Sequence, residues 1–207
     1  DELLHRYVLG LYHVMDVLTK RFPDVLFENC ASGGARMDAG MMYYFPQTWA
    51  SDNSDAVCRL KIQYGTSLCY PPVMTTSHIS ASPNHQMLRQ TPLDFRAAVS
   101  YPFNLGYELN LCKMSDEEIE KISEQTALYK KIRPLVQGGK FYRLLSPFEG
   151  NQTAWMTVSQ DEKEFLVWYY KDFADPEEAY INVRLTGLEE KAHYQDEVRK
   201  RFTAVIC

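Results

Sequence analysis

The chain has 207 residues, of which 45% are hydrophobic and 24% are charged, as in ordinary globular proteins and unlike disordered or fibrous ones. Its 22 Lys and Arg against 27 Asp and Glu give a net charge of −5, and no basic stretch could follow a phosphate backbone, so we expect no nucleic-acid partner. The apolar runs are too short to span a bilayer, so we expect no membrane partner either.

An amphipathic helix is predicted at the start of the chain. Apolar side chains recur at every third or fourth position over residues 1–22, and Pro23 follows shortly after. The next apolar run, 25–27, has no polar alternation and opens into the glycine loop 28–34, which favours a buried parallel strand feeding a loop. The chain starts without Met or a signal-peptide pattern, so we expect it to be a piece of a longer protein.

The same pattern recurs further along the chain. The apolar run 43–45 leads through Pro46 to a short stretch, 47–51, which ends in polar residues. Asp55 then stands where it could cap a helix over roughly 56–65, because its carboxylate can accept from the free amides of a first turn.

Two more strands and a long helix follow. Residues 73–79 are predicted to form a strand, and 96–109 a helical turn followed by a fourth strand. Ser115 and Glu118 have the spacing of a capping box, so a helix begins there, and Pro134 closes it. Strands that alternate with helices predict an α/β fold with a parallel sheet and polar loops at the strand ends.

The composition changes after the Gly-Gly pair at 138–139, and we place a domain boundary near 136–140. Short β-rich runs separated by turn-like clusters follow, which predicts an antiparallel β module. These runs are 141–145, 154–158, 165–170 and 180–185.

No metal site and no cofactor are expected. The five cysteines have spacings that fit neither a zinc cluster nor a disulfide framework, which favours reduced thiols in a cytoplasmic protein. They are Cys30, Cys58, Cys69, Cys112 and Cys207. His78 and His85 lie seven residues apart, without the spacing or the Glu of a zinc-binding helix, and are interpreted as polar loop histidines.

Three features could carry chemistry, and each has a structural alternative. The Cys-Ala-Ser-Gly-Gly loop, 30–34, could offer backbone amides to a ligand oxygen, or could be a tight turn that needs glycine. Asp52 and Asp55 could act as acid and base or bind a metal, but a helix cap and a solvated aspartate explain them equally well. Trp49 could stack on a sugar or lie in the core.

Taken together, the motifs point to one family. The chain resembles, over about residues 3–190, the C-terminal half of the bacterial alpha-galactosidases of glycoside hydrolase family 36, the melibiases. The resemblance runs in order through the segments 26–38, 43–52, 59–67, 83–86, 104–109 and 141–150, which include the Cys-Ala-Ser-Gly-Gly loop and the Trp-Ala-Ser-Asp motif.

The resemblance implies a retaining glycosidase that releases terminal alpha-linked galactose from melibiose and raffinose-type sugars. Such enzymes use two carboxyl groups about 5 Å apart, one as nucleophile and one as acid and then base. The resemblance makes Asp52 the acid/base, which must be protonated when the leaving oxygen departs and therefore needs burial and a neighbouring carboxylate. Cys30, Ser32 and Gly33 would line the galactose site, and Trp49 would shape the same pocket.

The family's nucleophile lies in a Lys-Trp-Asp segment, which these 207 residues lack. The implied fold is therefore the C-terminal half of a (β/α)8 TIM barrel, over 1–137, followed by an antiparallel β-sandwich module over 138–207. The expected partners are small alpha-galactosides, with a homo-oligomer in the full-length enzyme. One alternative is a non-catalytic galactose-binding or assembly fragment, and another is a hydrolase whose nucleophile is Asp24, Asp38 or Asp55.

Overall fold

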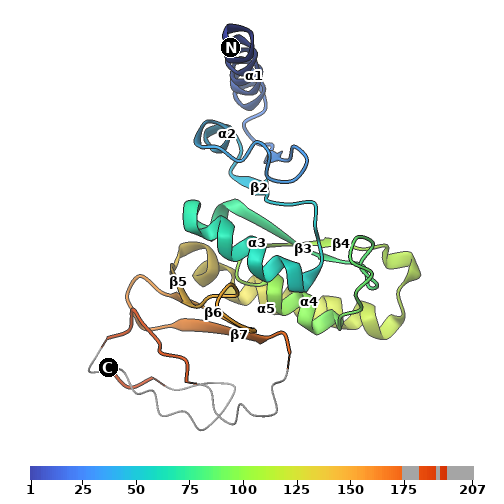
Figure 1. Cartoon of the computed structure of the whole chain (residues 1–207), viewed down its shortest axis with the longest axis vertical. Coiled ribbons are helices and arrows are strands. Elements are labelled where there is room, and N and C mark those ends of the chain that lie inside the picture. The colour runs from blue at the N-terminus through green and yellow to red at the C-terminus, as the bar shows by residue number, and fades with distance from the viewer. Residues whose placement is uncertain (174–181, 190–191, 195–207) are drawn as a thin grey trace.

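The computed structural model describes residues 1–173, 182–189 and 192–194. Four parallel strands form one sheet in sequential order, as predicted (Figure 1). They are β1 (Glu28–Asn29), β2 (Gln47–Trp49), β3 (Thr75–Ser80) and β4 (Asn104–Glu108). Because all four run the same way, the loops that follow them emerge at one edge of the sheet, and the candidate residues of the first two loops can meet there.

Helices separate the strands, and the sequence explains where two of them begin. The helices are α1 (Glu2–Arg21), α2 (Ala39–Tyr44), α3 (Ala56–Cys69), α4 (Leu93–Ser100) and α5 (Asp116–Gly138), with short 3₁₀ helices at Pro72–Met74 and Leu111–Lys113. Asp55 caps α3 by accepting a hydrogen bond from the Cys58 amide at 2.9 Å. Ser115 and Glu118 form the predicted capping box at the start of α5.

The first predicted strand is displaced along the chain. The apolar run 25–27 does not form it; β1 begins at Glu28, and Val25 and Leu26 are 53% and 71% exposed. An apolar run without alternation indicates burial only if neighbouring elements cover it, and no described element covers these two side chains.

The apolar run 43–45 does not form a strand either. Its two tyrosines end α2, and the second strand is β2, within the stretch 47–51. Asp38 caps the start of this helix, because its carboxylate accepts from the Met41 amide at 2.9 Å. This cap decides the conformation of a segment whose short apolar run fits helix and strand equally.

Pro134 does not close its helix, because α5 continues to Gly138. A proline inside a helix removes one backbone hydrogen bond and crowds the carbonyl four residues before it, at a cost that packing can offset. Val136, in the last turn, is 5% exposed and belongs to the main hydrophobic core, which holds the end of the helix in place.

The C-terminal part forms the predicted antiparallel sheet, in the order β5–β6–β7, from β5 (Lys140–Leu145), β6 (Gln152–Val158) and β7 (Phe165–Lys171). The fourth predicted run, 180–185, lies outside the described residues at 180–181, and 182–185 are not in a strand.

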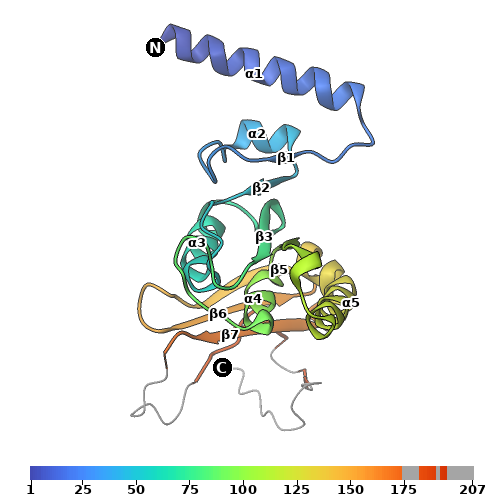
Figure 2. The same ribbon diagram turned by 90° about the vertical axis from the view of Figure 1, so that its right-hand side faces the viewer.

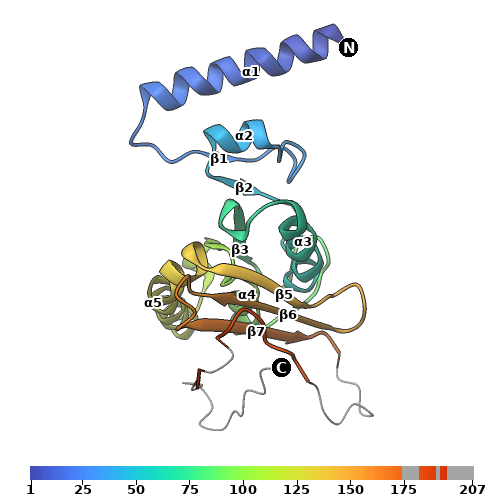
Figure 3. The same ribbon diagram turned by 90° about the vertical axis from the view of Figure 1, so that its left-hand side faces the viewer.

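One hydrophobic core joins the helices that follow the parallel strands to the antiparallel sheet. Leu60 of α3 and Val99 of α4 belong to the same buried cluster as Trp155 of β6 and Tyr170 of β7. The Trp155 ring packs 5.3 Å from the Tyr170 ring, centroid to centroid. Figures 2 and 3 show the antiparallel sheet at one end of the molecule, against the helices, and α1 at the other end. The helices that follow the parallel strands therefore rest on the antiparallel sheet.

Helix α1 stands apart from this core and has no buried residue. Its contacts run to α2: the Tyr12 and Tyr44 rings lie 6.0 Å apart, and the Tyr12 hydroxyl donates to Asp38 at 3.0 Å. Apolar side chains along it are exposed, with Leu3 at 80% and Leu4 at 68%. None of the helices in the described residues is both long enough and apolar enough to cross a membrane.

Candidate functional site

The glycine loop after β1 lies directly against the segment that carries Asp52. Gly33 has a φ of +70°, and a Cβ built on it would lie 2.7 Å from the Ser51 Cα and 2.8 Å from the Asp52 nitrogen. No side chain fits in that space, so glycine is required both for the backbone angle and for the close approach. The structure thus brings the predicted loop residues beside the predicted acid.

The rest of the loop is a tight turn with an exposed outer side. Ser32 also has a positive φ, of 49°, and Ala31 forms an isolated bridge with Gly34. The Asn29 side chain donates to the Arg36 carbonyl at 2.7 Å and closes the base of the loop. Cys30 and Ser32 are exposed, so the loop is at once the tight turn and a surface that a ligand can reach.

Asp52 itself is exposed, so the burial expected around the acid is not supplied by the described residues. Its main chain, in contrast, is held on both sides. Arg59 donates to the Ser51 carbonyl at 3.2 Å, and the Gln86 side chain donates to the Asp52 carbonyl at 2.5 Å. The position of Asp52 is therefore set by its backbone.

Two of the other candidate carboxylates, Asp55 and Asp38, have structural roles, and the third, Asp24, is exposed in the segment between α1 and β1. Asp55 is 1% exposed and, besides capping α3, accepts from Arg89 at 3.0 Å. Asp38 caps α2 and accepts from Tyr12. One oxygen of each carboxylate is thus engaged as a cap, which favours the cap interpretation of Asp55 and argues against either residue as a nucleophile facing Asp52. The second Asp55 oxygen, Oδ2, is buried without a hydrogen-bond partner among the described residues.

Trp49 lies in the interior, 8% exposed. The His78 ring stacks on it at 4.4 Å between centroids with an interplanar angle of 22°, and the Arg59 guanidinium lies over it at 4.3 Å. A ring engaged by two neighbours offers little free face to a sugar. The burial and contacts of Trp49 thus favour the core alternative that the sequence left open.

Burial lowers the pKa of both side chains that pack on the Trp49 ring. Arg59 is 1% exposed, and burial lowers its pKa to about 10; its remaining donors reach the Thr76 carbonyl at 2.9 Å and Gln63 at 3.2 Å. Burial also lowers the pKa of His78, opposed by the negative charges of Glu28 and Glu108. Burial therefore favours the neutral form of the imidazole more than water does.

Sequence reasoning missed Arg59 and Gln86. It also interpreted His78 as a polar loop histidine, although the residue lies within the predicted strand 73–79 and within β3. Nothing in the local pattern marks Arg59 or Gln86. Arg59 sits on a helix face and Gln86 in a loop 34 residues after Asp52, and the contacts appear only when the chain folds. Both fall within segments that carry the family resemblance, which is the signal that could have directed attention to them.

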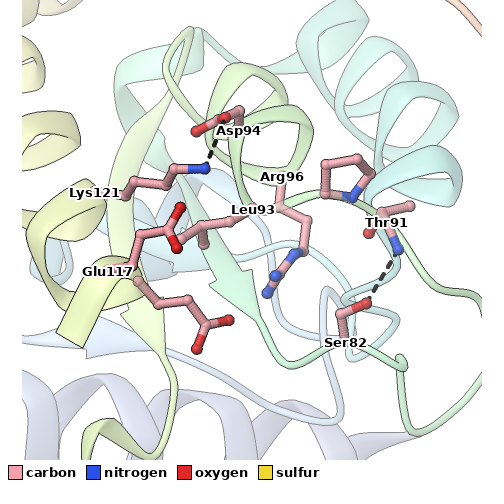
Figure 4. A pocket seen from close by; sticks show the side chains of 9 residues that line it. Ser82, Thr91, Leu93, Asp94, Arg96, Glu117 and Lys121 are labelled. Carbon is pink, nitrogen blue, oxygen red and sulfur yellow. Dashed lines mark hydrogen bonds and ion pairs between the residues drawn. The ribbon is translucent and has the colours of Figure 1, made fainter. Parts of the chain in front are cut away.

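A separate polar pocket of about 400 Å³ opens where the loop after β3 meets the first turns of α4 and α5 (Figure 4). Lys121 pairs with Asp94 at 3.8 Å on one side, and the Thr91 amide donates to Ser82 at 3.1 Å on the other. None of the predicted site residues lines it. The candidate site is the meeting of the first two loops, not this pocket.

Comparison with known proteins agrees with the resemblance. The melibiase family model matches residues 1–139, and the model of the glycosyl hydrolase family 36 C-terminal domain matches 152–204. Alpha-galactosidase AgaA of Geobacillus stearothermophilus is 53% identical over 196 residues, which is 95% of this chain and 27% of the relative. Alpha-galactosidase 1 of Pediococcus pentosaceus is 50% identical over 94% of this chain and 27% of its own length.

Solved structures of relatives also match most of this chain and about a quarter of their own length. The crystal structure of AgaA superposes with a TM-score of 0.88, covering 90% of this chain and 26% of that one, at 54% identity. Variants of AgaA have been solved in complex with raffinose and with stachyose. The present chain thus spans about a quarter of the length of these relatives. Because the melibiase family model matches more than half of its residues, the chain belongs to the melibiase family, glycosyl hydrolase family 36.

Proposed function

We propose that this chain is the acid/base-bearing part of a retaining alpha-galactosidase, acting on terminal alpha-linked galactose in raffinose-type sugars. One observation carries the proposal: the glycine loop packs against the main chain of Asp52, so the galactose-lining loop and the acid form one surface. The raffinose and stachyose complexes of AgaA support this substrate class. The expected cytoplasmic location belongs to the same proposal.

In this proposal Asp52 acts twice. Its protonated carboxyl group gives a proton to the glycosidic oxygen as the bond to the galactose C1 breaks, while a second carboxylate forms the covalent glycosyl-enzyme. The Asp52 carboxylate then takes a proton from the water that attacks C1 and releases galactose. The nucleophile belongs to a segment outside these 207 residues, because the Lys-Trp-Asp motif is missing from them.

The loop residues have separate tasks. Cys30 and Ser32 are exposed beside Asp52 and are proposed to contact galactose, whereas Gly33 lets the loop approach the acid. Trp49 shapes the floor of the pocket through its stack with His78. A closed barrel would also cover Asp52 and supply the burial and the second carboxylate that the acid needs.

The finer architecture belongs to the same proposal. The four parallel strands in sequential order are the arrangement expected of the last four strands of a (β/α)8 barrel, over 1–137. The antiparallel sheet would begin a β-sandwich module over 138–207. In such a barrel, β1 would pair with a preceding strand instead of forming an open edge.

The test is a segment exchange. In AgaA, the 196-residue segment that matches this chain is replaced by the chain, and hydrolysis of raffinose is measured. We expect activity, and its loss by about 10²-fold or more in Asp52→Asn, because the general acid is removed. Asp161→Asn, at an exposed loop aspartate, is the matched control and should leave the rate unchanged.

A folded exchange protein that hydrolyses no alpha-galactoside would refute the proposal. Calorimetric titration of the 207-residue chain with galactose then separates the alternative of a non-catalytic galactose-binding fragment, which would give heat, from an assembly fragment, which would give none.

A further inference from the structure

We propose that Gln86 is a positioning residue for the acid/base, acting through the main chain of Asp52. The inference rests on the proposed function, since it concerns how that acid is aimed. Gln86 belongs to the loop between β3 and α4 and lies 34 residues from Asp52 in sequence. It does not contact the sugar in this scheme; it fixes the peptide from which the carboxylate projects.

The amide of Gln86 makes two hydrogen bonds to the acid segment. Its Nε2 donates to the Asp52 carbonyl at 2.5 Å, and its Oε1 accepts from the Ser54 amide at 3.0 Å. A planar amide that binds a carbonyl and an N–H two residues apart reproduces the pairing that a neighbouring strand would offer. Both peptides that flank Asn53 are thereby held in one orientation.

The loop that carries Gln86 is itself held in place. Asn84 is 3% exposed, and its Oδ1 accepts from the Gln86 and Met87 amides at 3.0 and 2.9 Å. Its Nδ2 donates to the Ser54 hydroxyl at 3.1 Å, and Ser80 donates to the Ser54 carbonyl at 3.0 Å. These hydrogen bonds fix the loop to the same segment that Gln86 binds. The Gln86 side chain is therefore preorganised for its two contacts.

The main chain matters here because the carboxylate has no anchor of its own. Among the described residues the Asp52 carboxylate has no hydrogen-bond partner, and the side chain is exposed. Arg59 and Gly33 restrain the segment only before Asp52, at Ser51 and at the Asp52 nitrogen. Gln86 holds the Asp52 carbonyl, so its removal leaves the peptide after Asp52 with the single hydrogen bond from the Asn53 amide to the Ser51 hydroxyl, at 3.2 Å.

This role predicts a specific kinetic signature. A misdirected acid slows cleavage in proportion to the help that the leaving group needs, since the proton is given to the departing oxygen. The alkoxide that leaves raffinose is a strong base and needs the proton, whereas 4-nitrophenolate leaves with little help. A loss of folded protein would lower both rates equally, and kcat/KM reports on this first cleavage step.

The experiment compares Gln86→Ala with the unsubstituted chain in the segment-exchange enzyme. We expect kcat/KM for raffinose to fall by about 10-fold or more, and that for 4-nitrophenyl alpha-galactoside to fall by less than about 3-fold. Gln86→Glu should behave similarly, because a carboxylate oxygen would replace the donor to the Asp52 carbonyl. Gln90→Ala, at an exposed glutamine of the same loop, is the control and should change neither rate.

Each outcome decides one claim. Equal losses on both substrates, or no loss on either, overturn the positioning role even if the enzyme is active. If Asp52→Asn shows the selective loss on raffinose and Gln86→Ala does not, the proposed function stands and only this inference fails. An unsubstituted exchange protein with no activity refutes the proposed function, and the inference with it.

Discussion

Replacing Gly33 by alanine should disturb the site and its stability together. The new Cβ would lie 2.7 Å from the Ser51 Cα and 2.8 Å from the Asp52 nitrogen, both of them backbone atoms. The φ of +70° costs an L-residue about 1–2 kcal/mol, and relief of such crowding costs about 1–3 kcal/mol more. We therefore expect Gly33→Ala to lower the free energy of unfolding by about 2–5 kcal/mol.

The matched control is Gly65→Ala. Gly65 lies inside α3, and a Cβ there would meet no atom within 4 Å, so alanine should stabilise the helix by about 0.5–1 kcal/mol. Urea unfolding followed by circular dichroism compares the two variants, and amide exchange over residues 28–52 detects a purely local opening. The reasoning would be refuted if Gly33→Ala unfolded at the urea concentration of the unsubstituted chain and left exchange over 28–52 unchanged.

Three further predictions concern the scaffold. Tyr129→Phe should cost about 1–3 kcal/mol in urea unfolding, because the hydroxyl both donates to the Phe103 carbonyl at 2.7 Å and accepts from the Leu105 amide at 3.2 Å; an unchanged midpoint would contradict this. Burial lowers the pKa of His78, so below about pH 6.5 the unfolded state binds a proton that the folded state resists, and stability falls with falling pH. His78→Gln should flatten that dependence, and an equally steep profile would exclude His78 as its source. Amides of α1 should exchange faster than those of α3, since α1 has no buried residue, and equal protection would show otherwise.

Sequence reasoning succeeded where a local signal decides the structure. The caps at Asp55 and Ser115 lie within four residues of the amides they bind, so a pattern reveals them. The alternation of strands and helices predicted the parallel sheet, and the β-rich runs predicted the antiparallel one. These features depend on hydrogen bonds and periodicity within a short stretch of chain.

Reasoning from local patterns failed where distant residues decide. The run 25–27 is apolar, yet its neighbours leave it exposed, and Trp49 offered no local sign that His78 would stack on it. Gln86 meets Asp52 across 34 residues. The site residues themselves came from the family resemblance rather than from spacing, because neither a glycine loop nor a lone aspartate identifies a glycosidase.

The shared core connects the C-terminal sheet to the candidate site through α3. Trp155 packs in one cluster with Leu60, and Arg143 of β5 donates to the Ser67 carbonyl in the last turns of α3 at 2.8 Å. The first turns of that same helix carry the side chain of Arg59, which restrains Ser51. The position of Asp52 therefore depends on the C-terminal sheet, and exchanging that sheet between relatives should also shift the candidate site.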